Sequence, residues 1–205
     1  MASQLGIGEL ADWLGRAATR YAAGQGYLCD LDAAIGDGDH GANLARGFTA
    51  VVAKIGTPAS PGAMLKSSGM VLISTVGGAS GPLYGTLFVD MGKMAGDAPL
   101  LDKDAWTDLL KAGLAGVMAR GKAQPGDKTM IDALDPAVAA FAAAPNLGTG
   151  LAAAAQAAAA GAAATVPMIA RKGRASYLGE RAIGHQDPGA TSLAWLLEAL
   201  AQAAG

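Results

Sequence analysis

Cysteine, aromatic residues and net charge are all scarce in this sequence, and each scarcity excludes a class of protein. The 205 residues include one cysteine, Cys29, which excludes an internal disulfide and favours a reducing cytoplasm. The 15 Lys and Arg nearly balance the 17 Asp and Glu, so neither nucleic acid nor an anionic membrane is expected as a partner. The N-terminal stretch MASQLGIGELADWLG lacks a basic region followed by an apolar run, so no signal peptide is expected.

One apolar run, LAAAAQAAAAGAAATVPMIA, is long enough to span a bilayer. It consists mostly of alanine, carries Gln156 and contains Pro167, so a packed helix is favoured over a membrane span. Aromatic residues make up only 5% of the chain, and alanine supplies much of its 52% hydrophobic share. That composition favours helices, because alanine has the highest helix propensity and aromatic residues favour strands.

Apolar residues recur at helical spacing along the chain, as in Leu10, Trp13, Leu14, Ala17 and Tyr21, which share one helix face. No alternating strand pattern appears, and no linker is long enough to separate two domains. The sequence therefore predicts one all-α domain over residues 1–205, with antiparallel helices and short connections. The predicted helices run roughly over 7–23, 41–55, 61–76, 81–96, 102–120, 128–144, 147–171 and 188–203.

Four connections are glycine-rich and polar: LDAAIGDGDHGAN, TVGGASGP, RGKAQPGDKTM and RKGRASYLGERAIGHQDPGATS. The last of them is long and has no clear apolar face, and long structured loops of that kind are usually functional. In an up-and-down bundle, alternate connections lie at the same end, and these four are alternate connections. The sequence therefore predicts that they share one rim of the bundle.

The first of these loops has the composition of a cation site. Asp37 and Asp39 are two residues apart, so their carboxylates point the same way in an extended loop. Asp32 can fold back to the same point through Gly36 and Gly38. Three unpaired carboxylates at one place are strongly destabilised unless a cation neutralises them. Oxygen ligands alone favour a hard ion, Mg²⁺ or Ca²⁺.

The calcium-loop template does not fit this segment. Counted from Asp37, its sixth position is Ala42 instead of Gly, and its twelfth is Phe48 instead of Glu. Mg²⁺ bound by few carboxylates usually shares its coordination shell with phosphates, and the helix that begins near Gly41 aims free N–H groups into the loop. The alternative is a solvated turn with helix-capping aspartates, which the other three loops make a weaker interpretation.

Those other loops each leave two interpretations open. In GGASGP, Gly77 favours close backbone approach to a ligand and Ser80 offers a hydroxyl, but a plain interhelical turn has the same residues. RGKAQPGDKTM imitates a Walker A loop, yet it has one residue too many before the lysine and no strand in front. Arg174 suits either a phosphate or a surface salt bridge, and Asp187 before Pro188 predicts a helix start.

Four stretches resemble, in order and nearly word for word, the signature loops of one family: LDAAIGDGDHGAN, GGASGPLYGTLF, RGKAQPGDKTM and GRASYLGERAIGHQDPGATS. This family is the nucleotide-binding L subunit of dihydroxyacetone kinase, and it includes the C-terminal domain of single-chain ATP-dependent kinases. The resemblance covers essentially the whole chain. It implies an eight-helix antiparallel up-and-down barrel with the nucleotide pocket at one end. It also implies that Asp32, Asp37 and Asp39 bind two Mg²⁺ ions that bridge the phosphates of ADP or ATP.

The same resemblance implies which residues surround the nucleotide. They are His40, Gly41, Ala42, Asn43, Ala79, Ser80, Gly121, Met130, Arg174, Asp187, Pro188 and Gly189. No side chain is assigned a certain catalytic role, because the chain would position a phosphoryl group and stabilise its charge. In this family, dihydroxyacetone is held covalently on a histidine of a separate K subunit, so the chain would be active only with that partner.

Two modes of action stay open within the family. In the phosphotransferase-system mode, bound ADP is a resident cofactor that a phosphohistidine on an M subunit recharges, and the free-standing chain favours this mode. In the other mode, ATP exchanges freely and the acceptor is dihydroxyacetone or a related ketose. A different class of function is a nucleotide-loaded module that reports its state to a transcription regulator. The sequence also leaves the oligomeric state open, a homodimer included.

Overall fold

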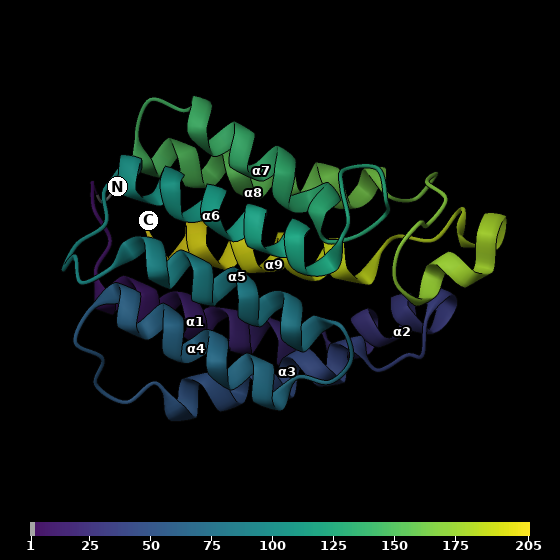
Figure 1. The fold of residues 1–205 in the computed structure, drawn as a ribbon, viewed down its shortest axis with the longest axis horizontal. Coiled ribbons are helices and arrows are strands. Elements are labelled where there is room, and N and C mark those ends of the chain that lie inside the picture. Colours follow the sequence, from purple (N-terminus) through teal and green to yellow (C-terminus); the bar gives the residue numbers. More distant parts are fainter. Residues whose placement is uncertain (1–2) are drawn as a thin grey trace.

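Helices make up nearly all regular structure in residues 3–205, the part of the chain that the computed structural model describes (Figure 1). They are α1 (Ile7–Ala23), α2 (Gln25–Ile35), α3 (His40–Lys54), α4 (Pro61–Thr75), α5 (Ser80–Ala95), α6 (Lys103–Gly121), α7 (Ile131–Ala143), α8 (Leu147–Ala164), the 3₁₀ segment η1 (Arg174–Ala182) and α9 (Pro188–Ala203). Within these described residues the β-type pairing is confined to an isolated antiparallel bridge between Leu5 and Leu101. The predicted all-α class is confirmed.

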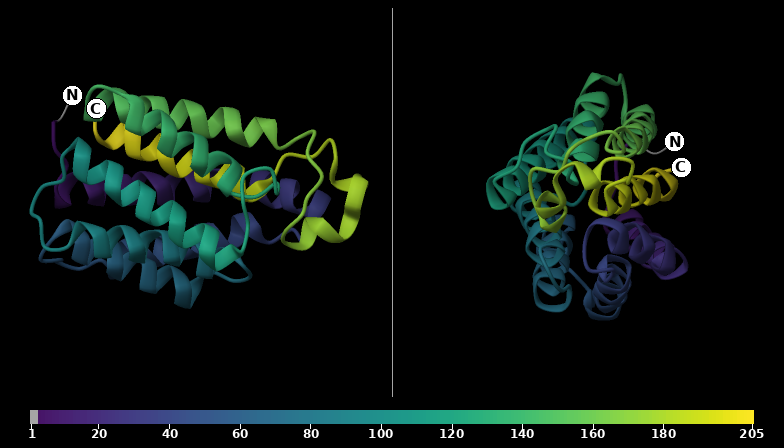
Figure 2. Two further views of the ribbon diagram at one scale, coloured as in Figure 1. Left: turned by 45° about the horizontal axis from the view of Figure 1, so that its top comes forward. Right: turned by 90° about the vertical axis from the view of Figure 1, so that its right-hand side faces the viewer.

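Eight of the helices described form a closed antiparallel ring. They pack in the order α1, α3, α4, α5, α6, α7, α8 and α9, and α9 packs against α1 to close the ring. Figure 1 shows the chain running up and down along the long axis, and Figure 2 shows the ring from its end. The helix α1 begins and α9 ends at one end of the barrel, whereas α2 and η1 lie at the other. The predicted eight-helix up-and-down barrel is confirmed.

Aromatic rings fill the barrel interior. Trp13 stacks on Phe88 with 5.3 Å between ring centroids and meets Trp106 edge-on at 6.0 Å. All three side chains are at most 1% exposed. Phe48 extends this cluster to Tyr21, whose ring centroid lies 4.7 Å away. Because each buried ring removes a large apolar area from water, these few aromatics contribute strongly to the stability of an alanine-rich chain.

The helix α8 is, by length and composition, the one helix in the described residues that could cross a membrane. In the barrel it packs between α7 and α9. The residues that it buries are mostly small: Leu147, Gly150, Leu151, Ala154, Ala158 and Ala162. Small side chains let neighbouring helices approach closely, which is how this alanine-rich segment fits into the ring.

Three segments differ from the sequence prediction. The sequence predicts no helix over 25–35, but α2 continues the chain after a break at Gly24, so Asp32 lies on a helix. Only Leu28 and Ile35 of α2 are buried, which leaves almost no apolar periodicity to detect. The helix predicted over 147–171 ends at Ala164, because the residue before Pro167 disfavours helical backbone. The fourth glycine-rich connection, predicted as a long loop, contains the 3₁₀ segment η1.

Candidate functional site

A pocket of about 480 Å³ opens at the end of the barrel where α2 and η1 lie. Each of the four glycine-rich loops contributes to its wall, for example through Asp37, Gly78, Thr129 and Arg174. The loops therefore share one rim, as the alternation of connections predicts. A cavity of this size lies in the range of small-molecule sites.

Three carboxylates converge at one side of this pocket. Asp32, Asp37 and Asp39 each offer one carboxylate oxygen, and these oxygens all lie within 4.8 Å of one another. Asp32 reaches the loop from α2, where its Oδ2 accepts the backbone N–H of Asp39 at 2.9 Å and of His40 at 3.2 Å. Gly36 permits this approach, because a Cβ at that position would collide with Asp32 Oδ1. The structure thus brings together the three aspartates that the sequence singles out.

The acidic cluster is only partly neutralised by the protein. Arg174 on η1 pairs with Asp37, with 2.9 Å between Nη2 and Oδ2. The two side chains are 65% and 37% exposed, so this pair contributes little stability. Asp39 is the N-cap of α3 but forms no side-chain capping hydrogen bond, which leaves its carboxylate available. An all-oxygen cluster with excess negative charge fits a hard divalent cation.

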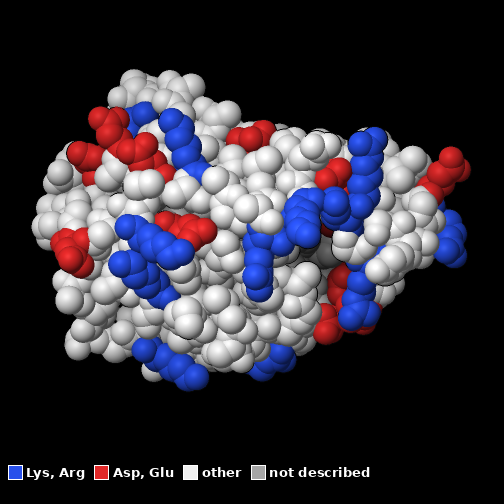
Figure 3. All heavy atoms as spheres, viewed as in Figure 1, with Lys and Arg blue, Asp and Glu red and all other residues white. Residues whose placement is uncertain are grey.

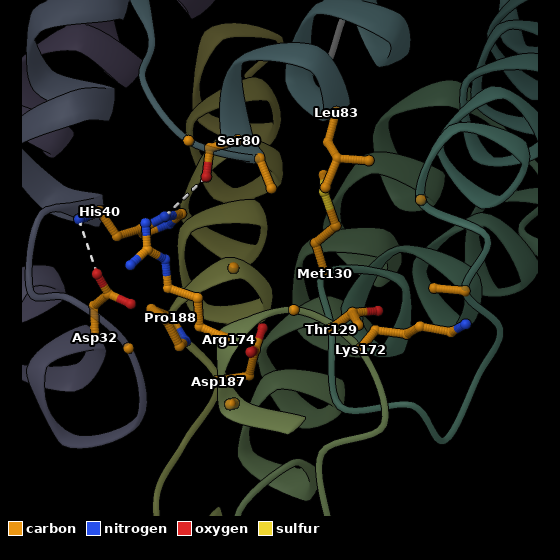
Figure 4. Close-up of a pocket in the computed structure, with 18 of the residues that line it drawn as sticks. Asp32, His40, Ser80, Leu83, Thr129, Met130, Lys172, Arg174, Asp187 and Pro188 are labelled. Carbon is orange, nitrogen blue, oxygen red and sulfur yellow. Dashed lines mark hydrogen bonds between the residues drawn. The ribbon is translucent and has the colours of Figure 1, made fainter. Parts of the chain in front are cut away.

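His40 connects the pocket to a buried hydrogen-bond network. Its Nδ1 lies 3.1 Å from Ser80 Oγ (Figure 4). Its Nε2 lies 2.8 Å from Ser192 Oγ. The hydroxyl of Tyr84 lies 2.7 Å from the same Ser192 oxygen. Burial lowers the pKa of His40, and the carboxylate of Asp32 opposes this shift. A neutral imidazole has one donor and one acceptor nitrogen, so the network holds both His40 and Ser80 in fixed orientations.

Another part of the pocket wall is apolar. Leu83 on α5 and Met130 at the start of α7 approach each other there (Figure 4). Val117 and Gly121 of α6 belong to the same lining. An apolar slot beside a polar cluster suits a ligand with a flat ring at one end and charge at the other. Sequence reasoning names Gly121 and Met130 but misses Leu83 and Val117, although Leu83 directly follows the GGASGP loop.

Asp187, Pro188 and Gly189 form the part of the rim where α9 begins. Asp187 accepts the backbone N–H of Ala190 at 2.7 Å, which confirms the predicted N-cap. Only 8% of Asp187 is exposed, and burial raises the pKa of its carboxyl to about 7. The pocket therefore contains one carboxyl group whose pKa lies close to neutral pH.

Not every residue implied by the resemblance lines the pocket. Ala79 and Ser80 do, but Gly41, Ala42 and Asn43 lie in the first turn of α3, outside the lining. Gly41 packs against α2, where a Cβ would collide with a backbone carbonyl, and Asn43 Oδ1 accepts from a neighbouring guanidinium. The backbone N–H of Asn43 donates to the carbonyl of Asp39 at 2.9 Å, so only the N–H groups of Gly41 and Ala42 in this turn are free to meet a ligand. That role stays a prediction.

The third loop supplies a residue that sequence reasoning misses. Lys128 belongs to the stretch that imitates a Walker A loop, and it lines the pocket while being only 1% exposed. A lysine this buried is unusual, since its ammonium must find partners inside the protein. The signal that could have found it is the density of glycine, proline and charge in RGKAQPGDKTM.

Comparison with known proteins identifies the family of this chain. A family model described as the DAK2 domain matches residues 34–202. The chain belongs to the DAK2 domain family. It is 45% identical over 202 residues to the ADP-binding subunit DhaL of the PEP-dependent dihydroxyacetone kinase of Escherichia coli, covering 96% of each chain. It is 36% identical to L-erythrulose 1-kinase of Mycolicibacterium smegmatis, covering 84% of this chain and 31% of that enzyme.

A solved structure shares the DAK2 fold. The dihydroxyacetone kinase from C. freundii, in complex with AMP-PNP and Mg²⁺, superposes with a TM-score of 0.70 at 29% sequence identity. The match covers 94% of this chain and 33% of that one. The chain therefore spans about a third of that larger kinase, and its near full-length relatives are separate ADP-binding subunits.

Proposed function

We propose that this chain is the nucleotide-binding subunit of a phosphoenolpyruvate-dependent dihydroxyacetone kinase and holds ADP or ATP with Mg²⁺ in the pocket at the barrel end. The observation that carries the proposal is the convergence of Asp32, Asp37 and Asp39 in a pocket that also has an apolar slot. One pocket thus offers a place for a metal–phosphate group and a place for a base. The similarity to the Escherichia coli subunit over nearly the full length supports the reaction class.

The three aspartates would hold the two Mg²⁺ ions. Their oxygens form the hard, anionic donor set that Mg²⁺ prefers, and Asp39 makes no capping hydrogen bond that competes for its carboxylate. When bound, Mg²⁺ supplies positive charge that neutralises the phosphate oxygens and orients them.

The protein's own groups would orient the phosphates. In the first turn of α3, Gly41 and Ala42 present free N–H groups that suit an anion, and Asn43, which follows them, is proposed to border the phosphates. Ala79 lies beside Ser80 on the facing loop. His40 fixes the hydroxyl of Ser80 at the edge of the pocket. These groups are held by the fold before a ligand arrives, so they need little reorganisation to stabilise phosphoryl charge.

The remaining residues would enclose the nucleotide. Gly121 and Met130 border the apolar slot proposed for the base, and Arg174 contributes a guanidinium from η1. Asp187, Pro188 and Gly189 would close the rim at the start of α9. Enclosure excludes water and slows ligand release, which a resident nucleotide requires.

The proposed partners come from the family resemblance. Because the Escherichia coli relative is one subunit of a PEP-dependent dihydroxyacetone kinase, the proposed acceptor is dihydroxyacetone on a separate K subunit. The proposed donor is a phosphohistidine on an M subunit, which recharges the bound ADP. We propose a cytoplasmic location and a single domain over residues 1–205 for this role.

Multiple-turnover kinetics test the proposal. With free ATP in solution, the ATP-loaded protein mixed with a K subunit and dihydroxyacetone should deliver one phosphoryl group per chain and then stop until an M subunit carrying a phosphohistidine is added. Calorimetry should show that EDTA abolishes ADP binding. ADP binding that is unchanged by EDTA would contradict the role of the three aspartates.

A second candidate is a subunit of an ATP-dependent ketose kinase, which the similarity to L-erythrulose 1-kinase favours. Sustained turnover with free ATP and a K subunit, without an M subunit, would identify this mode. The same assay with erythrulose as acceptor would then distinguish the two ketoses.

A further inference from the structure

Lys128 joins the two ends of the segment that covers the pocket. We call residues 168–182 the lid, since its residues 172–175 line the pocket and it contains η1. The Lys128 ammonium donates to the carbonyl of Met168 at 3.1 Å and to the carbonyl of Ala182 at 2.6 Å. One side chain from a different loop thus holds the first and the last residue of the lid.

The surroundings of Lys128 indicate that this contact is built into the fold. The residue is 1% exposed and has a left-handed backbone, with φ 61°, which is uncommon for a residue other than glycine. Asp132 stabilises the loop around it by accepting the backbone N–H of Gly126 at 2.5 Å and of Thr129 at 2.7 Å. Burial lowers the pKa of Lys128, and the carboxylate of Asp187 opposes that shift. The ammonium is therefore a buried donor whose partners are lid carbonyls.

Other contacts hold the lid in the same place. Just outside it, the N–H of Gly184 donates to the carbonyl of Val166 at 2.8 Å. Within it, the N–H of Arg171 donates to the carbonyl of Asp127 at 3.0 Å. A small apolar cluster, separate from the barrel core, packs the lid against the end of α2 and consists of Ile35, Ala170, Ala175 and Ala182. Figure 3 shows basic side chains beside a hollow at this end of the molecule.

We propose that Lys128 is a positioning residue that closes the base of the lid and thereby holds Arg174 over the pocket. Without the ammonium, the carbonyls of Met168 and Ala182 would lose a shared charged donor, and the remaining contacts would hold the ends of the lid together less firmly. Arg174, which pairs with Asp37 at 2.9 Å, would then lose its fixed position. The effect on nucleotide binding rests on the proposed function, whereas the effect on the lid does not.

Hydrogen–deuterium exchange on Lys128→Met tests the inference. Methionine keeps a similar length and removes the ammonium. Lid amides should exchange about tenfold faster than in the wild type, while amides of α1 and α5 keep their rates. Lys122→Met is the matched control, because Lys122 also has a left-handed backbone (φ 48°) but is exposed. Unchanged lid exchange in a folded Lys128→Met protein would overturn the proposal.

Calorimetry with Mg²⁺ and ADP provides the second readout. Affinity should fall about tenfold in Lys128→Met and stay unchanged in Lys122→Met. A loosened lid with unchanged affinity would overturn the claim that Lys128 acts on the pocket through Arg174. If the wild type itself bound no ADP, the proposed function would fail, and the exchange experiment would still decide the role of Lys128.

A measurement on the wild type covers the case in which Lys128→Met does not fold. Reductive methylation should modify Lys122 rapidly and Lys128 only at the rate at which lid amides exchange. Equal methylation of the two lysines would show that the Lys128 ammonium is free, and would overturn the proposal.

Discussion

Replacing Asp187 by asparagine isolates the effect of one carboxyl group whose ionised form the fold disfavours. Asp187 caps α9 beside the pocket, and burial raises the pKa of its carboxyl from 3.8 to about 7. The hydrogen bond from the Ala190 N–H and the charge of Lys128 lower the pKa, whereas Asp132 and Asp32 raise it further. Asparagine keeps the capping acceptor, because both residues are favoured at N-caps, but it does not titrate.

Proton binding to Asp187 determines how the free energy of unfolding changes with pH. A carboxyl whose pKa is higher in the folded state holds its proton more tightly there. The free energy of unfolding therefore falls as pH rises from about 4, the unfolded pKa, to about 7, the folded one. With 1.36 kcal/mol per pKa unit, the loss between about pH 5 and about pH 8 is roughly 2–3 kcal/mol. Asp187→Asn should be free of this loss.

Urea denaturation of both proteins in EDTA, without nucleotide, measures the difference. The free energy of unfolding of the variant minus that of the wild type should rise by about 2–3 kcal/mol across this pH range. His40, whose pKa burial lowers, is present in both proteins, so its contribution largely cancels in the difference. A difference that stays constant with pH would refute the reasoning, because it would mean that Asp187 titrates alike in the folded and unfolded states.

Three further perturbations test separate parts of the site. Asp39→Asn should weaken Mg²⁺-dependent ADP binding at least about tenfold by calorimetry, because it removes one anionic ligand, while the exposed control Asp30→Asn should change nothing. Gly41→Ala should lower the free energy of unfolding by about 1–3 kcal/mol, since its Cβ collides with the α2 backbone, whereas Gly15→Ala, with open space around it, should not destabilise in the same thermal melts. Limited proteolysis should cut the chain between 172 and 186 more slowly with Mg²⁺ and ADP than without; equal rates would indicate that this segment does not respond to the nucleotide.

Local sequence patterns were sufficient for the eight helices of the barrel ring and for the rim. The apolar spacing from Leu10 to Tyr21 predicts α1, and Asp187 before Pro188 predicts where α9 begins, because both signals depend on residues close together in the chain. Alternation of connections in an up-and-down bundle places the four glycine-rich loops at one end. The convergence of Asp32, Asp37 and Asp39 follows from the same local spacing.

Other features depend on contacts between distant segments. The helix α2 has few buried residues, so its position comes from packing against α3 and α9, which no local pattern reveals. Leu83 and Val117 form part of an apolar slot only because α5 and α6 bring them to one pocket.

Lys128 shows most clearly which contacts cannot be predicted from the sequence. Its partners are the backbone carbonyls of Met168 and Ala182, and a carbonyl is present at every residue, so nothing in the sequence marks those two. The raised pKa of Asp187 likewise depends on burial by segments far away in the chain. Periodicity and spacing are local properties that a sequence determines alone, whereas burial and long-range hydrogen bonds exist only once the barrel has closed.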